Sequence, residues 1–267
     1  MKISFAVSLQ KTSFCYIAAN GSFLKKASLI SKLGYDGIEL GIRNPDSVKA
    51  NQLVALLKQL RLEISAIGTG QAYLDDDLSL TDSNIKIRKQ AVERIKKHIS
   101  LARVLESQVI IGLIRGKKQG SLKKSLKLLL SSIKSICDYS VRNNVVITIE
   151  PLNRYETDLL NSAEEAIDFI KQVNCNKLKL LLDTFHMNIE EKDMLQTVNK
   201  TSKYISHIHF ADNTRRCPGE GSIDFKSIVG LLKKNDYQGY ISGEMLPEPS
   251  ADYCMKRFIK NLKKIGV

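Results

Sequence analysis

The segment VVITIEPLNRYETDLLNSAEEAIDFIKQVNCNKLKLLLD, residues 145–183, contains two β-rich runs separated by an amphipathic stretch. The runs VVITIE (145–150) and KLKLLLD (177–183) are rich in aliphatic residues, and each ends in a carboxylic acid. The stretch between them opens with a capping box, in which Ser162 precedes Glu165 by three residues, and continues with apolar residues at helical spacing. The segment therefore predicts a strand, a helix and a second strand.

This pattern repeats along the whole chain. The predicted strands are residues 3–9, 37–40, 63–68, 108–114, 145–150, 177–183, 204–210 and 239–244. The predicted helices are about 22–33, 46–60, 82–105, 120–142, 162–173, 190–202, 224–235 and 251–265. Eight such units in 267 residues, with no linker or low-complexity tract, predict a single α/β domain over residues 1–267, a (β/α)₈ TIM barrel. A doubly wound open sheet is the alternative, but no GxGxxG motif follows the first strand.

The formal net charge of +13 is the unusual global feature. An anionic partner such as nucleic acid would explain it, but the lysines cluster on polar faces of predicted helices, which favours a solvated surface. No run of 18 apolar residues and no signal-peptide pattern is found. We therefore expect a cytoplasmic protein that binds neither nucleic acid nor membrane. The cysteines are scattered, without a CxxC pair, which favours reduced thiols; they are Cys15, Cys137, Cys175, Cys217 and Cys254.

Ionisable residues stand at the ends of four consecutive predicted strands. Glu150 and Asp183 end the fifth and sixth strands, His209 lies near the end of the seventh, and Glu244 ends the eighth. In a barrel these ends meet on one rim, where active sites lie. Three converging carboxylates repel one another unless a cation joins them, and with one imidazole they suit Mn²⁺, Co²⁺, Mg²⁺ or Zn²⁺. We expect a divalent-metal site here, with His207 packed deeper in its strand.

Polar residues in the loops beyond the strand ends are candidates for substrate contacts. They are Gln71 in GTGQAY, Arg115 in GLIRG, Glu156 in PLNRYETD, His186 in DTFHM and Arg215 in ADNTRRC. Arginines suit bidentate capture of a carboxylate or phosphate, and their alternative role is a salt bridge to a nearby acid.

Several stretches resemble the xylose isomerase-like TIM barrel group of sugar isomerases and epimerases. They are IEPLNRYETD (149–158), LLDTFHMNIEE (181–191), HIHFADNTRRCPGEGSIDF (207–225) and ISGEMLP (241–247). Their spacing is shared with ketose 3-epimerases of the tagatose and allulose type. Three further stretches are more similar to the 5-keto-L-gluconate epimerases, which interconvert 5-keto-L-gluconate and D-tagaturonate. These are GTGQAYLDDDLSLTDSN (68–84), VIIGLIRG (109–116) and EPLNRYETDLLNS (150–162).

The resemblance covers essentially the whole chain and implies an epimerase that inverts the carbon next to a ketone through a metal-stabilised enediolate. It implies a divalent metal, with Mn²⁺ favoured, and a small sugar substrate; relatives are commonly homo-oligomers. The implied metal ligands are Glu150, Asp183, His209 and Glu244. Of these, Glu150 and Glu244 are also the implied proton-transfer pair, and the implied substrate contacts are Glu156, His186 and Arg215. Neutral-sugar epimerases place aromatics in the first and fourth loops, whereas this chain has no Trp and carries Arg115. An acidic keto sugar is therefore expected, with Arg115 or Arg216 as the candidates for its carboxylate.

Three other activities stay open. A ketose 3-epimerase acting on a free or phosphorylated ketose, or an aldose–ketose isomerase such as hydroxypyruvate isomerase, would use the same metal and a similar enediol. A DNA-repair enzyme of the AP endonuclease IV type shares the barrel but needs a three-zinc site with additional histidines. The chain has only His98, His186, His207 and His209, too few ligands for three metals. A non-catalytic binding protein would be indicated by loss of a strand-end ligand, and none is lost.

Overall fold

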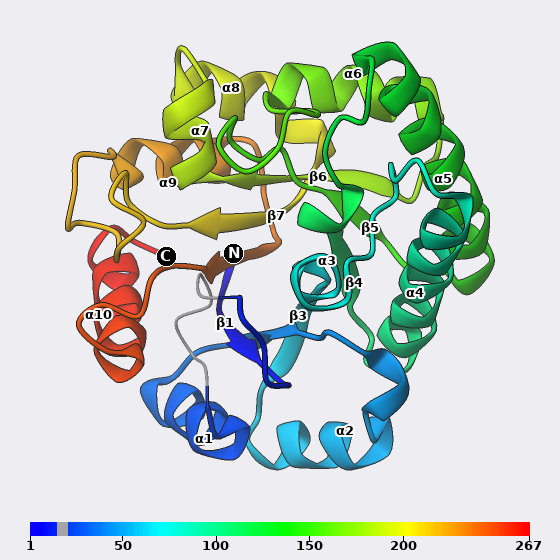
Figure 1. Cartoon of the computed structure of the whole chain (residues 1–267). Helices are drawn as coiled ribbons and strands as arrows, with labels where there is room; N and C mark the ends of the chain where they lie inside the picture. Colours follow the sequence, from blue (N-terminus) through cyan, green and yellow to red (C-terminus); the bar gives the residue numbers. More distant parts are fainter. Residues whose placement is uncertain (15–20) are drawn as a thin grey trace.

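Eight parallel strands close into a barrel in sequence order (Figure 1). The computed structural model describes residues 1–14 and 21–267; Cys15 lies outside the described residues. The strands are β1 (Lys2–Ser8), β2 (Gly37–Gly41), β3 (Glu63–Gly68), β4 (Gln108–Ile111), β5 (Ile147–Ile149), β6 (Leu178–Asp183), β7 (Ile205–Phe210) and β8 (Tyr240–Gly243). The barrel closes through pairing of β1 with β8. The predicted TIM barrel is therefore confirmed.

Most helices surround the barrel, whereas α3 lies within their ring, beside β3 and β4 (Figure 1). The helices are α1 (Phe23–Leu33), α2 (Ala50–Gln59), α3 (Gly70–Asp76), α4 (Ile85–Val104), α5 (Leu122–Asn143), α6 (Ala163–Val173), α7 (Thr184–Glu190), α8 (Met194–Thr201), α9 (Phe225–Lys234) and α10 (Ala251–Lys264). Short 3₁₀ helices are η1 (Pro45–Ser47), η2 (Leu113–Arg115) and η3 (Ser202–Tyr204). Within the described ranges, no helix has the length and apolar content of a membrane span. The four described cysteines are free thiols.

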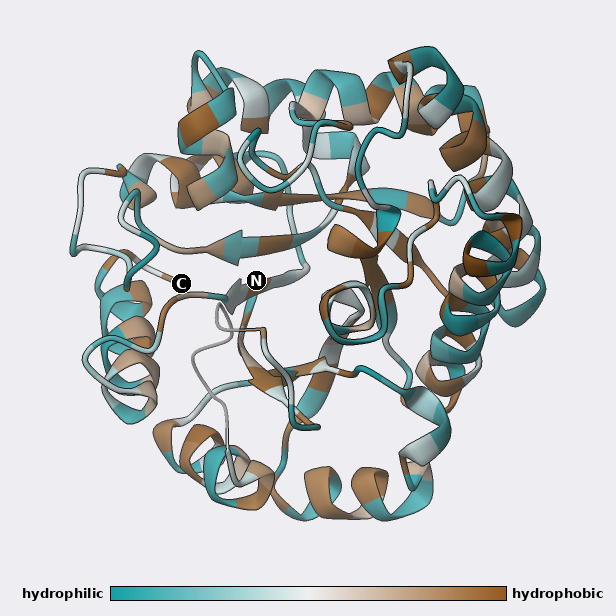
Figure 2. Ribbon diagram, in the orientation of Figure 1, coloured by the Kyte–Doolittle hydropathy of each residue, from teal (hydrophilic) through white to brown (hydrophobic). Residues whose placement is uncertain are grey.

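The main hydrophobic core lies between the strands and the surrounding helices. Figure 2 shows hydrophobic residues along the strands and on the helices, where they alternate with hydrophilic ones. Strand residues Ile38 and Leu40 and the helix residues Ile30 and Phe258 are fully buried. The capping box predicted from the sequence begins α6, because the Ser162 hydroxyl accepts from the Glu165 amide and the Glu165 side chain accepts in return.

Two short helices at the rim were not predicted, and the predicted strands 108–114 and 145–150 were each three residues too long. Helices α3 and α7, each of seven residues, follow β3 and β6 almost directly. Seven residues give too little periodicity to mark a helix in the sequence. The predicted strand 108–114 ends at Ile111, and Leu113 and Ile114 belong to η2. Ile114 is buried in the main core, and the half-buried Leu113 packs against the small cluster of Ala6 and Phe14, so both residues belong to a packed turn and do not extend the strand.

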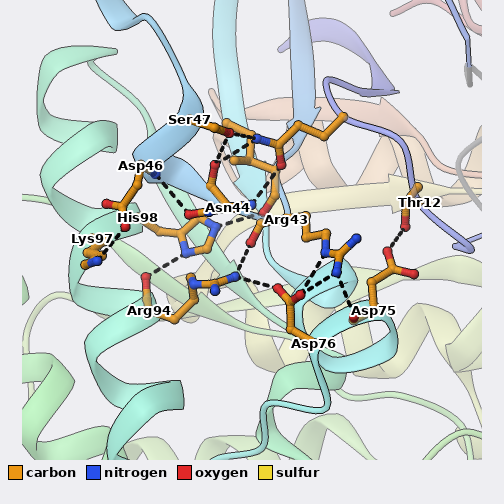
Figure 3. Close-up of polar contacts among 12 residues, drawn as sticks. Thr12, Arg43, Asn44, Asp46, Ser47, Asp75, Asp76, Arg94, Lys97 and His98 are labelled. Atoms are coloured by element: carbon orange, nitrogen blue, oxygen red, sulfur yellow. Dashed lines mark hydrogen bonds and ion pairs between the residues drawn. The ribbon is translucent and has the colours of Figure 1, made fainter.

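Helix α3 is held in place by ion pairs at its C-terminal end (Figure 3). Asp76 accepts a hydrogen bond of 2.9 Å from Arg43 Nε, beyond β2, and one of 2.7 Å from Arg94 in α4. Asp75 accepts from the Thr12 hydroxyl, in the loop after β1. The network therefore joins the loops after β1 and β2 to α3 and α4, next to the rim where the site lies.

Candidate metal centre and active site

Four ionisable side chains meet at the C-terminal end of the barrel. Asp183 ends β6, His209 lies in β7, and Glu150 and Glu244 directly follow β5 and β8. His209 is in register with Asp183 on one side and with Ser242 on the other, which brings the strand ends level. One ligand atom from each of the four residues lies within 4.8 Å of the others. The structure thus brings together all four residues predicted as metal ligands.

Three of the four donor atoms that converge in this cluster have no hydrogen-bond partner among the residues that the structure describes. His209 Nδ1 lies 3.4 Å from Glu150 Oε1, 3.4 Å from Glu244 Oε2 and 3.7 Å from Asp183 Oδ2. Glu150 Oε1, Asp183 Oδ2 and His209 Nδ1 are buried and unpaired. Buried polar atoms without partners are costly and rare in folded proteins. A donor set of three carboxylates and one imidazole therefore fits a divalent cation.

The pKa values of the cluster describe the same conflict between charges. Burial raises the pKa of Asp183 to about 7; His209 opposes this rise, and Glu150 and Glu244 add to it. Burial also raises the pKa of Glu150. Burial would lower the pKa of His209, but Glu39 and Glu244 more than offset it and hold that pKa well above its usual value. Without a metal the cluster holds protons, which a bound cation would displace.

Glu39 contacts both strand-seven histidines, although its sequence position did not mark it as a site candidate. It lies in β2, is buried, and its Oε2 is 2.8 Å from His207 Nε2 and 3.0 Å from His209 Nε2. His207 therefore faces Glu39 and not the four-residue cluster, in keeping with the prediction that it packs deeper than His209. The signal in the sequence was an acidic residue inside the apolar run GIEL (37–40), where an unpaired carboxylate would be costly.

Four of the five predicted substrate residues line the pocket above the cluster: Gln71, Glu156, His186 and Arg215. Arg215 Nη1 donates to Glu156 Oε1 at 2.5 Å, and its guanidinium lies 4.7 Å from the centre of the Phe185 ring. Its backbone is left-handed, with φ of 56°, which is uncommon for a residue with a side chain. Gln71 donates to the Ser8 hydroxyl, and its Oε1 has no hydrogen-bond partner within residues 1–14 and 21–267.

His186 is held as a neutral imidazole with a defined tautomer. The Asn153 amide nitrogens, main-chain and side-chain, lie 3.3 and 2.7 Å from His186 Nδ1. Both groups donate, so Nδ1 accepts and the ring proton is on Nε2. Burial lowers the pKa of His186 well below its usual value, and nearby Arg215 lowers it further. His186 can therefore donate from Nε2 to a substrate oxygen, and Asn153, which was not predicted, orients it.

Arg115 is the exception among the predicted substrate residues. Its side chain is fully buried, and it donates to the main-chain oxygens of Leu159 at 3.0 Å, Leu160 at 3.3 Å and Glu150. The guanidinium therefore ties the end of β5 to the loop before α6. The structure places Arg115 behind the site and corrects the prediction that it meets a substrate carboxylate. The reason is local: the apolar turn η2 directs the residue inwards and not towards the rim.

The closed barrel and the polar cluster at its C-terminal strand ends define a TIM-barrel enzyme. The family described as "Xylose isomerase-like TIM barrel" matches residues 27–265, and the chain belongs to this family. It is 28% identical to the L-ribulose 3-epimerase of Methylomonas sp. (strain DH-1) over 226 residues, which cover 83% of this chain and 78% of that protein. It is 27% identical to the 3-dehydro-D-guloside 4-epimerase of Escherichia coli (strain K12), over 82% of this chain and 86% of that protein.

Solved structures share the fold over nearly the whole chain. The 3-keto-D-glucoside 4-epimerase from E. coli, in its apo form, superposes with a TM-score of 0.84 at 21% identity, covering 98% of this chain and 100% of that one. The D-allulose 3-epimerase from Methylomonas sp. in complex with D-allulose has a TM-score of 0.83 at 22% identity, covering 98% and 97%. The family and the curated relatives place the chain among enzymes of the isomerase class.

Proposed function

We propose that this enzyme inverts the carbon next to the ketone of a keto sugar, with Glu150 and Glu244 as the proton-transfer pair. The observation that carries this proposal is the position of the two carboxylates. They come from β5 and β8, and each lies 3.4 Å from His209 Nδ1. Inversion through a planar enediolate needs one proton-transfer group on each face, and two carboxylates on separate strands can meet that need.

The same cluster supports a divalent cation, and we propose Mn²⁺ first because oxygen donors outnumber the single imidazole. When bound, such a cation would supply positive charge that stabilises the negative charge developing on the substrate oxygens. Asp183 serves only as a ligand in this scheme. Its carboxylate also accepts from the main-chain amides of Phe185 and His186, which fixes its orientation.

The protein residues move the proton as follows. Glu150 takes the proton from the carbon beside the ketone, and the electron pair of the broken C–H bond passes into the enediolate. Glu244, starting protonated, gives its proton to the opposite face of the same carbon, and the ketone re-forms. The roles exchange in the reverse direction. His186 and Arg215 hold substrate oxygens in the pocket.

We propose an acidic keto sugar of the 5-keto-L-gluconate and D-tagaturonate type as the substrate. The loop stretches GTGQAY and EPLNRYETD support this choice, and Arg215 is the cation lining the pocket. A neutral ketose is the second candidate, because Arg115 is unavailable to a carboxylate and Glu156 offsets part of the Arg215 charge. The known ketose 3-epimerases among the relatives favour this second candidate as well.

A product assay tests the proposal. Hexuronates, free ketoses and ketose phosphates are incubated with enzyme and Mn²⁺ in deuterated water, and the products are analysed by NMR. We expect epimers that carry one deuterium at the inverted carbon; a shifted carbonyl would instead indicate an isomerase. Glu150→Gln and Glu244→Gln should each abolish turnover in a folded protein. Glu63→Gln, at the opposite end of the barrel, is the matched control. Near-normal kcat in either site variant would rule out the two-glutamate scheme.

A further inference from the structure

Glu39 joins two histidines in the interior of the barrel, below the proposed metal cluster. One oxygen of its carboxylate, Oε2, lies within hydrogen-bond distance of both His207 Nε2 and His209 Nε2, at 2.8 and 3.0 Å. All three side chains are at most 3% exposed. The opposite ring nitrogen of His209, Nδ1, faces the three carboxylates of the cluster. Glu39 thus lies directly behind a proposed metal ligand.

The hydrogen bonds below His207 determine where its ring proton is. Gln108 Nε2 lies 3.3 Å from the Ser65 carbonyl oxygen and 3.4 Å from the Ser206 carbonyl oxygen. Carbonyl oxygens only accept, so this end of the amide is the NH₂ group, and the Thr148 hydroxyl lies 2.9 Å from the other end, Oε1. The NH₂ group also faces His207 Nδ1 at 3.4 Å. His207 Nδ1 is therefore an acceptor, and the proton of the neutral ring is on Nε2, directed at Glu39.

The same reasoning applies to His209. A carboxylate that accepts from His207 can accept a second proton donor at the same oxygen but cannot donate to it. His209 must therefore present Nε2–H to Glu39, so Nδ1 is the ring nitrogen that faces the cluster and can bind a cation once its own proton is displaced.

We propose that Glu39 is a positioning residue that fixes His209 with Nδ1 as its metal-binding atom and strengthens that ligand with a negative charge. His207 donates to Glu39, and Gln108 contacts the opposite ring nitrogen of His207, so both residues help to hold Glu39 in position. This inference rests on the proposed metal site. Metal-bound histidines commonly donate their other ring N–H to a carboxylate, and loss of that partner costs about 10- to 100-fold in metal affinity.

The Glu39, His207 and His209 side chains could themselves be taken for a second metal site, because their ligand atoms lie within 4.8 Å of one another. Their geometry argues for hydrogen bonds instead. Both contacts end on one oxygen at 2.8 and 3.0 Å, the usual length for N–H···O bonds, and the contact of His207 Nδ1 with the Gln108 NH₂ group places the His207 proton on Nε2. We therefore expect one metal ion per chain.

The test measures metal binding without turnover. The affinity of the metal-free protein for Mn²⁺ is measured by calorimetry for wild type, Glu39→Gln and Glu39→Asp. Glutamine keeps the shape but loses the charge, so we expect 10- to 100-fold weaker binding, with partial recovery in the aspartate variant. Ser4→Ala is the control, because its buried hydroxyl in β1 has no partner to lose. An unchanged affinity in a folded Glu39→Gln protein, or two Mn²⁺ ions bound per wild-type chain, would overturn the inference.

A second measurement needs no variant. Nitrogen-15 NMR of wild-type protein loaded with Zn²⁺ identifies the metal-bound nitrogen of His209, which should be Nδ1, with a proton on Nε2. Metal on Nε2 would overturn the inference even if Glu39→Gln does not fold. The two proposals fail separately. A wild-type protein that binds no divalent cation contradicts the proposed function, whereas wild-type binding that is insensitive to Glu39 contradicts only the role given to Glu39.

Discussion

Gly112 leaves room for the carboxylate of Glu150, and replacing it with alanine should displace that group. Gly112 lies between β4 and η2, and a Cβ atom built on it would be 2.7 Å from Glu150 Oε2. Close carbon–oxygen contacts are about 3.3 Å or longer. The carboxylate must therefore move by about 0.6 Å, because the backbone of Glu150 is held by Arg115.

The size of the expected effect follows from this displacement. A misplacement of about 1 Å in a catalytic geometry can cost about 100-fold in rate. A shift of about 0.6 Å, scaled on a logarithmic axis, then lowers kcat by roughly 10- to 30-fold. The Glu150 carboxylate also belongs to the proposed metal cluster, so the affinity for Mn²⁺ should fall in the same variant.

The assay is steady-state kinetics at saturating Mn²⁺, with thermal unfolding as a check on folding. Gly68→Ala is the matched control, because Gly68 lines the same pocket but its added Cβ would approach nothing closer than 3.9 Å. We expect Gly68→Ala to keep kcat within about twofold of wild type, as ordinary van der Waals contact requires no displacement. If Gly112→Ala matches that control in kcat, the position of the Glu150 carboxylate does not limit the reaction as we argue.

Three other predictions concern the metal, the core and the rim. Without metal the pKa of Asp183 is raised to about 7, so its proton competes with the cation near neutral pH. The apparent Mn²⁺ affinity should therefore fall as the pH drops from 7.5 to 5.5. A pH-independent affinity would contradict this competition. Arg115→Leu leaves three main-chain oxygens without their donor. The free energy of unfolding, measured by urea titration, should therefore fall by about 3–5 kcal/mol. A change in KM alone would instead support a substrate role for Arg115. Asp76→Ala removes the acceptor that Arg43 and Arg94 share, so α3 should become more mobile and KM should rise. A change in Mn²⁺ affinity instead would contradict the separation of this network from the metal cluster.

The sequence was sufficient for the fold because the alternation of strands and helices is a local pattern. Each strand and each long helix has its own periodicity or cap, such as Ser162 with Glu165, and these signals do not depend on distant residues. The four-residue cluster was also predictable. In a parallel barrel the carboxyl ends of all strands meet on one rim, so acidic residues and a histidine at successive strand ends must converge there.

Only the tertiary structure decided the roles of residues whose partners lie across the barrel. Arg115 looked like a rim arginine in sequence, but its guanidinium reaches carbonyl oxygens more than forty positions further along the chain at Leu159 and Leu160. Glu39 was a single acidic residue within the apolar run 37–40, and its partner His207 lies 168 positions further along the chain. A buried charge is stable only beside a complementary group, and which group lies beside it depends on how the strands are arranged in the closed barrel. Sequence alone therefore indicated which strand-end residues converge at the rim, and the folded barrel determined where Arg115 lies and how each buried charge is neutralised.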